Sequence, residues 1–376
     1  LKMNFFNFRK NAEVAVIDFG SSKIVVFVGK KTPDGFLFVA RGESKYAGFY
    51  DGEWLEPERL SDAVSYALRQ AEQSYGRQIR EVFVGVPGEF TSVTVGEATN
   101  LYRFKKRITK DDVNEIYKKT DIFDGDKKFL PIGRSDIYFT LDDKEDVADP
   151  IGRTANKMDG LISYCFASRA FTDVVGAILK KCALSGWEFV SSCLAQSLLL
   201  IEQSVRDGYA LLLDVGYITS NVMLVCGEGL VYLKSFSMGC GNISADLQQV
   251  MEISFAQAEE LKSKVNLKLE FDSSDNYVLS GGLSLKAEKA NEVVRARIEE
   301  IADYFAKALE LCPYEIKRNT PIYVTGGGLS SVIGGTEYFS QYLDVNVKNA
   351  LPDIPQATKA FYTSAYGLLD IALKQK

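Results

Sequence analysis

Two stretches of the sequence, about 196 residues apart, share a residue pattern that could bind phosphate and a metal ion. They are Asp18-Phe-Gly20-Ser21-Ser22-Lys23 and Asp214-Val-Gly216-Tyr217-Ile218-Thr219. Glycine lets the chain turn tightly, so that successive backbone N–H groups can converge on phosphate oxygens. Lys23 could neutralise a β- or γ-phosphate. Asp18 and Asp214 could hold Mg²⁺ through water molecules, as this strongly hydrated ion prefers. Either stretch alone could be an ordinary turn, but the matched pair indicates a phosphate site.

A cluster of three glycines, Gly326, Gly327 and Gly328, follows a strand predicted over residues 321–325. Such a segment lets the backbone approach a flat ligand such as a nucleoside, although a tight strand–helix turn has the same pattern. Gly239 and Gly241 form a further glycine turn before a predicted helix. Their amides could face a phosphate tail or simply begin the helix.

Glu259 and Lys262 are three residues apart on a helix predicted over residues 255–265, so they share a face of that helix. They could bind the hydroxyl groups of a ribose. The alternative is a surface salt bridge, which would contribute little to stability.

The composition excludes several kinds of site. The chain has 376 residues, a net charge of −6 and no histidine, which rules out Ser-His-Asp and Cys-His catalysis and every histidine-containing metal site. The six cysteines form no Cys-x-x-Cys motif, so reduced, mostly buried thiols in a cytosolic protein are expected. Without a basic surplus, nucleic acid is not an expected partner. No apolar run approaches the roughly 18 residues that indicate a membrane span.

Each aspartate-containing stretch lies between two predicted strands, which predicts a β-hairpin. Its recurrence predicts two related halves that face each other. Apolar periodicity predicts helices over residues 57–74, 171–184, 194–205, 285–311 and 356–373 within a mixed α/β pattern. Residues 82–165 differ: strands at 82–86 and 91–95, a charged helix after Thr109 and an acidic loop at 142–149 predict a small α+β insert.

The order of the two hairpins and the glycine cluster resembles the actin/Hsp70/sugar-kinase ATPase fold. Within it, four further stretches resemble FtsA, the family of bacterial actin-like cell-division proteins. They are Val84-Gly-Val-Pro-Gly-Glu-Phe90, Arg107-Ile-Thr-Lys-Asp-Asp-Val113, Asp149-Pro-Ile-Gly152 and Ala258-Glu-Glu-Leu-Lys262. The first three resemble the opening strand, the helix and the exit of the subdomain inserted in FtsA. The fourth resembles the family's Ala-Glu-x-x-Lys helix. The resemblance spans about residues 12–373.

The resemblance implies an α/β, actin-like ATPase fold, with two duplicated halves around a nucleotide cleft and an FtsA-type inserted α+β subdomain. Subdomain IA would comprise residues 11–81, 166–205 and 352–376, and the inserted subdomain IC residues 82–165. Subdomain IIA would comprise residues 206–250 and 313–351, and subdomain IIB residues 251–312.

The resemblance also implies roles for the residues above and a function. Asp18 and Asp214 would face Mg²⁺ and the phosphates of ATP. The phosphates would be surrounded by Gly20, Ser21, Ser22, Lys23, Gly216, Tyr217, Ile218, Thr219, Gly239 and Gly241. Glu259, Lys262 and the glycines at 326–328 would surround the nucleoside. FtsA-like proteins polymerise into filaments, bind the C-terminal peptide of FtsZ, here expected on subdomain IIB, and tether FtsZ filaments to the inner face of the cytoplasmic membrane at midcell.

Two departures from the family pattern predict ATP binding with weak or absent hydrolysis. The second hairpin in the family usually reads Asp-x-Gly-Gly-Gly-Thr-Thr-Asp, whereas here Tyr217 and Ile218 replace glycines and Asn221 replaces the acid. Their bulk could crowd the γ-phosphate. Residues 191–193 also lack the acidic residue that orients the attacking water in related ATPases, and positioning that water is a large part of phosphoryl-transfer catalysis.

The membrane anchor of the family is a C-terminal amphipathic helix, whereas this sequence stops after the predicted closing helix. The anchor is therefore expected to be either truncated or absent. An alternative lies at the N-terminus, where Phe5, Phe6 and Phe8 stand beside Arg9 and Lys10. This segment could lie in the interface of an anionic membrane, or the aromatics could be incidental in a disordered start.

Two other functions remain as alternatives. A PilM-like scaffold of type IV pilus assembly would have a similar fold and insert, but would bind a short peptide from a membrane partner. A small-molecule kinase of the same superfamily would need a carboxylate base facing a sugar pocket, for which the sequence offers no candidate. The stretches at 107–113 and 149–152 favour FtsA.

Overall fold

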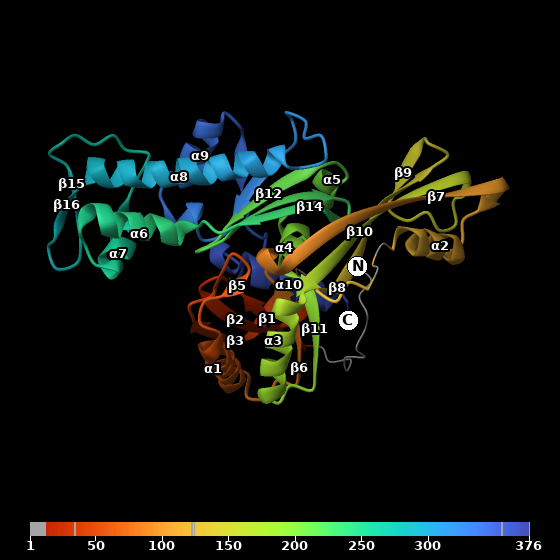
Figure 1. The fold of residues 1–376 in the computed structure, drawn as a ribbon, viewed down its shortest axis with the longest axis horizontal. Helices are drawn as coiled ribbons and strands as arrows, with labels where there is room; N and C mark the ends of the chain where they lie inside the picture. The colour runs from red at the N-terminus through yellow and green to blue at the C-terminus, as the bar shows by residue number, and fades with distance from the viewer. Residues whose placement is uncertain (1–12, 34, 122, 124, 355, 376) are drawn as a thin grey trace.

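The computed structural model describes residues 13–375 apart from residues 34, 122, 124 and 355. The described chain forms two halves, each built on a five-stranded sheet, and an inserted sheet that extends away from them (Figure 1).

The first sheet has the strand order β11–β6–β1–β2–β3. Its strands are β1 (Glu13–Phe19), β2 (Lys23–Thr32), β3 (Gly35–Lys45), β6 (Glu81–Val86) and β11 (Gly186–Ser191). β1, β2 and β3 form an antiparallel meander, and β6 and β11 run parallel to β1.

The second sheet has the order β14–β13–β12–β17–β18. Its strands are β12 (Ala210–Val215), β13 (Ser220–Cys226), β14 (Gly229–Phe236), β17 (Ile322–Thr325) and β18 (Val347–Asn349). The first three again form an antiparallel meander, and the last two again run parallel to the central strand. The shared topology confirms the prediction of two related halves.

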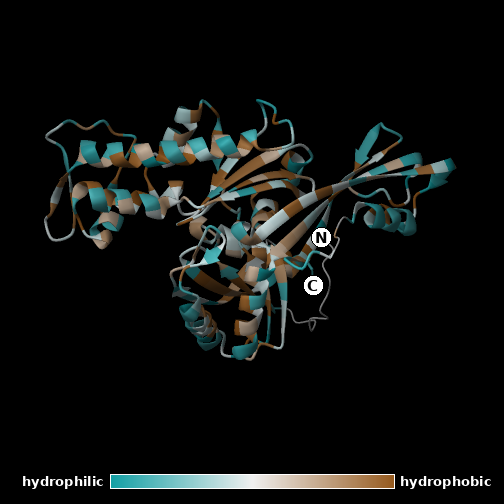
Figure 2. Ribbon diagram, viewed as in Figure 1, coloured by the Kyte–Doolittle hydropathy of each residue, from teal (hydrophilic) through white to brown (hydrophobic). Residues whose placement is uncertain are grey.

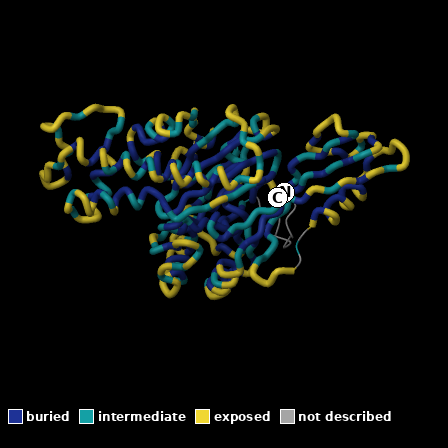
Figure 3. Tube along the Cα trace, turned by 45° about the horizontal axis from the view of Figure 1, so that its top comes forward, coloured by how far each residue is buried: buried dark blue, intermediate teal, exposed yellow. Residues whose placement is uncertain are grey.

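Alternation along β1 explains how the first sheet is buried on both faces. Ile17 and Phe19 pack in one core with α1 (Pro57–Tyr75) and α3 (Arg169–Lys181), whereas Val14 and Val16 pack with α10 (Thr363–Lys374). A strand covered on both faces reads as a continuous apolar run, because successive residues point to opposite sides. The hydrophobic strands of Figure 2 accordingly lie among the buried segments of Figure 3.

Most predicted helices are present, with bounds that differ by a few residues. In the second half these are α7 (Phe255–Lys264) and α8 (Ala287–Glu310), beside α6 (Cys240–Met251), α9 (Gly335–Leu343) and the short strands β15 (Asn276–Val278) and β16 (Ser284–Lys286). The helix predicted at 194–205 is two helices, α4 (Ser192–Leu200) and α5 (Gln203–Arg206).

The closing helix differs more from its prediction, because α10 begins at Thr363 rather than at Gln356 and follows a single 3-10 turn, Ala360–Tyr362. Before that turn, the side chain of Gln356 accepts a hydrogen bond from the backbone of Phe38 at 3.3 Å, and Ala357 is buried. These contacts hold the segment as a loop against the first half.

The insert is an antiparallel sheet of β7 (Thr91–Arg107), β10 (Thr154–Ser168), β8 (Phe129–Leu141) and β9 (Glu145–Val147), in that order, with α2 (Lys110–Thr120) packed on it. This confirms the predicted α+β insert. One strand was misplaced: residues 82–86 belong to β6 of the first sheet. β6 pairs with β1 and β11, and its Val82, Val84 and Val86 are fully buried in the core that also contains residues of α1 and α3. The inserted sheet thus spans residues 91–168, and the other subdomain boundaries stay predictions.

The insert also packs against the second half. The Ser163 hydroxyl on β10 donates a hydrogen bond to the Leu230 carbonyl on β14 at 2.5 Å. A Cβ atom at Gly227 would clash with the Ile137 carbonyl of β8, so only glycine permits this approach. Among the described residues, no helix is both long and apolar enough to cross a membrane.

Candidate functional site

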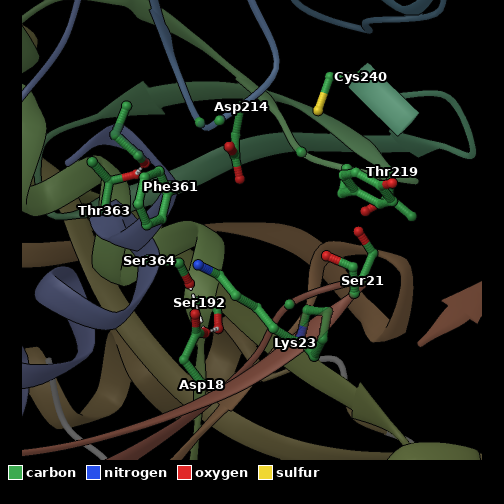
Figure 4. Close-up of a pocket in the computed structure, with 18 of the residues that line it drawn as sticks. Asp18, Ser21, Lys23, Ser192, Asp214, Thr219, Cys240, Phe361, Thr363 and Ser364 are labelled. Carbon is green, nitrogen blue, oxygen red and sulfur yellow. Dashed lines mark hydrogen bonds between the residues drawn. The ribbon is translucent and has the colours of Figure 1, made fainter. Parts of the chain in front are cut away.

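A cavity of about 440 Å³ lies between the two halves, where the predicted site residues converge (Figure 4). Thirteen of the predicted residues line it: Asp18, Gly20, Ser21, Ser22, Lys23, Asp214, Gly216, Tyr217, Thr219, Glu259, Lys262, Gly326 and Gly327. Four others, Ile218, Gly239, Gly241 and Gly328, do not line it. Residues separated by more than 300 positions are thus brought to one site by the facing halves.

The two hairpins close with the same hydrogen bond. The Gly20 N–H donates to the Lys23 carbonyl at 2.9 Å, and the Gly216 N–H donates to the Thr219 carbonyl at 2.9 Å. A Cβ atom at Gly216 would lie 2.6 Å from that carbonyl, closer than real Cβ contacts. The duplication therefore extends from the strand order to the turn beside the cavity.

The tips of the hairpins touch each other across the cleft. The Ile218 N–H donates a hydrogen bond to the Ser21 hydroxyl at 3.0 Å. Ile218 therefore contributes its backbone to a contact between the halves rather than a side chain to the cavity wall.

The two aspartates lie on facing walls of the cavity (Figure 4). Asp18 accepts hydrogen bonds from the hydroxyls of Ser364 at 2.7 Å and Ser192 at 3.2 Å, yet burial raises the pKa of its carboxyl group. Burial and then the charge of Asp18 raise the pKa of Asp214 to about 6, against hydrogen bonds from Gln196 and Asn221.

This carboxylate pair fits a hydrated Mg²⁺ ion. Neither aspartate forms a direct ion pair with a described lysine or arginine, so both carboxylates are available to a cation that would offset their burial. The described residues contain no cluster of three or more metal-ligating side chains. A cation here would thus complete its shell with water and ligand oxygens, as Mg²⁺ commonly does.

Lys23 extends from the first hairpin into an aromatic contact. Its Nζ lies 4.1 Å from the ring centre of Phe361, 4.0 Å from that of Tyr362 and 4.0 Å from the carboxylate of Glu43. Burial is the main cause that lowers the pKa of Lys23 to about 8. The amine thus retains a cation at neutral pH within reach of an anionic ligand in the cavity.

Glu259 and Lys262 form an ion pair at 2.9 Å, and Lys262 is buried, with 4% of its surface exposed. The Glu259 side chain is 38% exposed, so the pair is partly buried and differs from a fully exposed salt bridge. The Tyr217 hydroxyl also donates to Glu259 at 3.3 Å, and Ser244 is a further donor. Burial raises the pKa of Glu259, but hydrogen bonds from Lys262 and Ser244 outweigh it and hold the pKa below its usual value.

The glycines at 326–328 and those at 239 and 241 make different contacts. Gly326 has φ +89°, and a Cβ atom there would clash with the carboxylate of Asp214. Gly328 packs against Val215 instead of the cavity. The Gly241 N–H donates to the Tyr217 carbonyl at 2.7 Å and the Gly239 N–H donates to the Asn242 side chain at 2.9 Å. Both amides predicted to face a phosphate tail are therefore engaged within the protein.

Several cavity residues were not predicted. They include Ser192, Gln196, Asn221, Phe361, Thr363 and Ser364. Ser192 begins α4, and Thr363 and Ser364 begin α10. For Ser192, Thr363 and Ser364 the sequence signal is a hydroxyl residue at the start of a helix. For Thr363 and Ser364 that signal can be used only if α10 is predicted to begin at Thr363.

The fold and the cavity define the class of protein. The "PilM-PilN type IV pilus biogenesis complex" superimposes with a TM-score of 0.65 and 13% identity, over 96% of this chain and 98% of that chain. MreB 5 of Spiroplasma citri bound to AMPPNP superimposes with a TM-score of 0.58 and 12% identity, over 97% of this chain and 98% of that chain. The chain has the actin-like ATPase fold.

Within this class, the sequence is similar to FtsA. The family model described as "Cell division protein FtsA" matches residues 211–367. The FtsA of Enterococcus faecalis is 22% identical over 346 residues, which are 90% of this chain and 78% of that protein. The FtsA of Pseudomonas aeruginosa is 20% identical over 375 residues, 96% of this chain and 89% of that protein. The resemblance to the FtsA cell-division proteins is thus found over most of the chain.

Proposed function

We propose that this chain is an ATP-binding, actin-like cell division protein that polymerises and tethers FtsZ filaments to the cytoplasmic membrane at the division septum. The observation that carries the proposal is the similarity to FtsA over most of the chain. A second observation supports it: the cavity is lined by two hairpins whose turns are closed by the same hydrogen bond.

In this proposal the two hairpins enclose the phosphates of ATP, and Asp18 and Asp214 hold a hydrated Mg²⁺ ion. Bound Mg²⁺ would supply positive charge to the phosphate oxygens. Lys23 binds the terminal phosphates, the Glu259–Lys262 pair binds the ribose, and the backbone at 326–327 contacts the base. All of these residues line the cavity.

We expect hydrolysis to be weak. Tyr217 is held between Glu259 and the glycine turn at 241, and the hairpin tips are joined by the Ser21 contact. Asn221, in place of an acid, accepts a hydrogen bond from Ser235 at 2.7 Å. In this proposal the carboxylates of Asp18 and Asp214 are occupied by the hydrated Mg²⁺ ion, so neither serves as the base that orients the attacking water. Single-turnover assays with radiolabelled ATP test this, and rapid turnover comparable to an active actin-like ATPase would contradict it.

Subdomain IIB is the proposed surface for the FtsZ tail. Phe255, Leu269 and Val278 in this region are between 41% and 56% exposed, so an apolar peptide could bury them. We expect a labelled FtsZ C-terminal peptide to bind, with affinity reduced about tenfold in Phe255→Ala, the size of effect expected for a truncated interface anchor. Tyr66→Ala in α1, also exposed, serves as the control. Equal affinity in both variants would remove IIB as the site.

The membrane part of the proposal concerns the ends of the chain. Phe5, Phe6 and Phe8 lie outside the described residues. We propose that the protein is peripheral on the inner face of the membrane, through this segment or through another amphipathic anchor. Vesicle co-sedimentation that is unchanged after deletion of residues 1–10 would exclude the N-terminal anchor.

A PilM-like scaffold remains a second candidate because of the superposition with the PilM–PilN complex at a TM-score of 0.65. It would bind a peptide from a membrane partner of the pilus machine instead of FtsZ. Capture of such a peptide, with no binding of the FtsZ tail, would favour this candidate.

A further inference from the structure

The outer end of β7 exposes an amphiphilic segment at the edge of the molecule. In Figure 1 this end lies at the far right, away from both five-stranded sheets, and the same region is exposed in Figure 3. Leu101 is 77% exposed and Phe104 is 73% exposed, the two largest values among the exposed large apolar side chains of the described residues. Both are therefore available to a partner surface.

The backbone pairing pushes this segment outward. Leu101 is paired with Lys157 of β10, and Lys106 is paired with Ala155. Four residues of β7, numbers 102–105, are thus opposed by a single residue of β10. Such a bulge bends a strand and re-aims its side chains. β7 is also an edge strand of the inserted sheet, so one side of the bulge has no neighbouring strand.

The backbone of the bulge is held in place by contacts of Tyr102 and Lys106 with the rest of the insert. Tyr102 packs against the core of the insert, and its hydroxyl is buried. Lys106 lies 5.0 Å from the Tyr102 ring centre and forms an ion pair with Asp112 at 2.8 Å. The segment is therefore held by an inward aromatic residue and a neighbouring ion pair.

Basic side chains surround the two apolar ones. Four of the seven residues from 101 to 107 are basic, and the Arg103 guanidinium lies 5.4 Å from the Phe104 ring centre. Within the described residues, Arg103, Lys105 and Arg107 form no ion pair. The local positive charge stands out in a chain whose net charge is −6.

The nearby acidic side chains already have partners. Asp142 accepts backbone hydrogen bonds from Asn156 at 2.8 Å and Lys157 at 3.0 Å. Asp143 pairs with Lys157 at 2.6 Å, and Glu145 pairs with Arg153. Lys105 acts on Asp142 only through its charge, without an ion pair, so the side chains of Arg103, Lys105 and Arg107 remain available to an external anion.

We propose that the bulge at residues 101–107 is a membrane-contacting surface that binds an anionic lipid bilayer, with Leu101 and Phe104 entering the interface and Arg103, Lys105 and Arg107 contacting lipid phosphates. Exposed apolar side chains flanked by basic residues suit this surface, because burial of the apolar groups and attraction to anionic headgroups act together. The contact is distinct from the nucleotide cavity and from the chain ends, and it would set the orientation of the insert relative to the membrane.

Vesicle binding of matched variants tests the proposal. Vesicles of equal parts phosphatidylglycerol and phosphatidylcholine should bind the protein, and pure phosphatidylcholine vesicles should bind it much more weakly. The variants Leu101→Ser with Phe104→Ser, and Arg103→Glu with Lys105→Glu, should each lower the apparent affinity at least about tenfold. The double variant Leu55→Ser with Leu351→Ser, at exposed apolar positions outside the insert and outside subdomain IIB, should bind like the wild type.

A tryptophan placed at position 104 reports whether the bulge itself enters the membrane interface. Any anchor at the chain ends is the same in all variants, so it does not account for a difference between them. In F104W, emission should shift to shorter wavelength with the anionic vesicles. Unchanged vesicle affinity in both bulge variants, or an unchanged F104W spectrum, would overturn the proposal. A spectral shift with polyglutamate but none with vesicles would also overturn it, and would identify an acidic protein segment as the partner.

Discussion

The backbone of Ile218 and the hydroxyl of Ser21 are joined by a hydrogen bond of 3.0 Å between two hairpins whose residues are 197 positions apart. The contact links the two halves of the actin-like fold at the proposed phosphate end of the cleft. It joins the two hairpins into a single structural unit. A phosphate group that entered between them would have to replace this bond.

Ser21→Ala should lower the free energy of unfolding by about 1 kcal/mol, because the Ile218 N–H loses its partner. Ser22→Ala is the control, since the neighbouring Ser22 is engaged through its backbone carbonyl with Tyr46 at 3.2 Å. Urea unfolding of both variants measures the difference. Equal stability would mean that the hairpin tips do not hold each other in solution.

Asp214 should make the ligand-free protein less stable as the pH rises. Its folded-state pKa is about 6, raised from 3.8 chiefly by burial, so the folded state favours the protonated carboxyl. The stabilisation is complete below pH 3.8 and is lost as the pH rises to about 6. At pH 7, Asp214→Asn should therefore be more stable than the wild type by about 3 kcal/mol. Thermal unfolding between pH 4 and 7.5 without Mg²⁺ tests this, and a constant difference across that range would contradict it.

Gly326→Ala should destabilise the protein and disturb the carboxylate of Asp214. The position has φ +89°, and the added Cβ would clash with that carboxylate. Gly281→Ala is a matched control, because Gly281 has φ +85° but no atom within 4 Å of the added Cβ. The control should cost about 1 kcal/mol from backbone strain alone, and Gly326→Ala clearly more. Equal costs in chemical denaturation would show that the loop relaxes away from Asp214.

Lys23 should give ATP binding a pH dependence. With a pKa of about 8, the amine loses its proton between pH 7 and 9, so affinity for ATP should fall over that range as the cation is lost. Lys23→Gln should bind ATP about tenfold more weakly at pH 7, because a charge-assisted hydrogen bond is removed. Its affinity should also vary less with pH. Adenosine is the control ligand, and equal effects on adenosine and ATP would place Lys23 away from the phosphates.

The sequence predicted those parts of the fold and cavity that depend on local pattern. The two hairpins, the duplication they imply and the long helix of the second half follow from glycine spacing and apolar periodicity over short windows. The shared face of Glu259 and Lys262 is equally local, and the structure adds that Lys262 is buried.

The remaining errors come from contacts between distant segments. Residues 82–86 were placed in the insert, but β6 pairs in parallel with β1 and β11, and parallel pairing leaves no local turn signal. Ser364 and Phe361 were missed because the start of α10 depends on Gln356, whose partner Phe38 is 318 positions away. No short window of sequence contains that information.

ATP binding by calorimetry, with and without Mg²⁺, on the wild type and Asp214→Ala tests the central claim most directly. The account predicts micromolar affinity that depends on Mg²⁺ in the wild type and is lost in the variant. Absence of ATP binding to the folded wild type would contradict it. In that case Tyr217 and the joined hairpin tips close the cavity to nucleotides, and the chain acts as a nucleotide-independent scaffold.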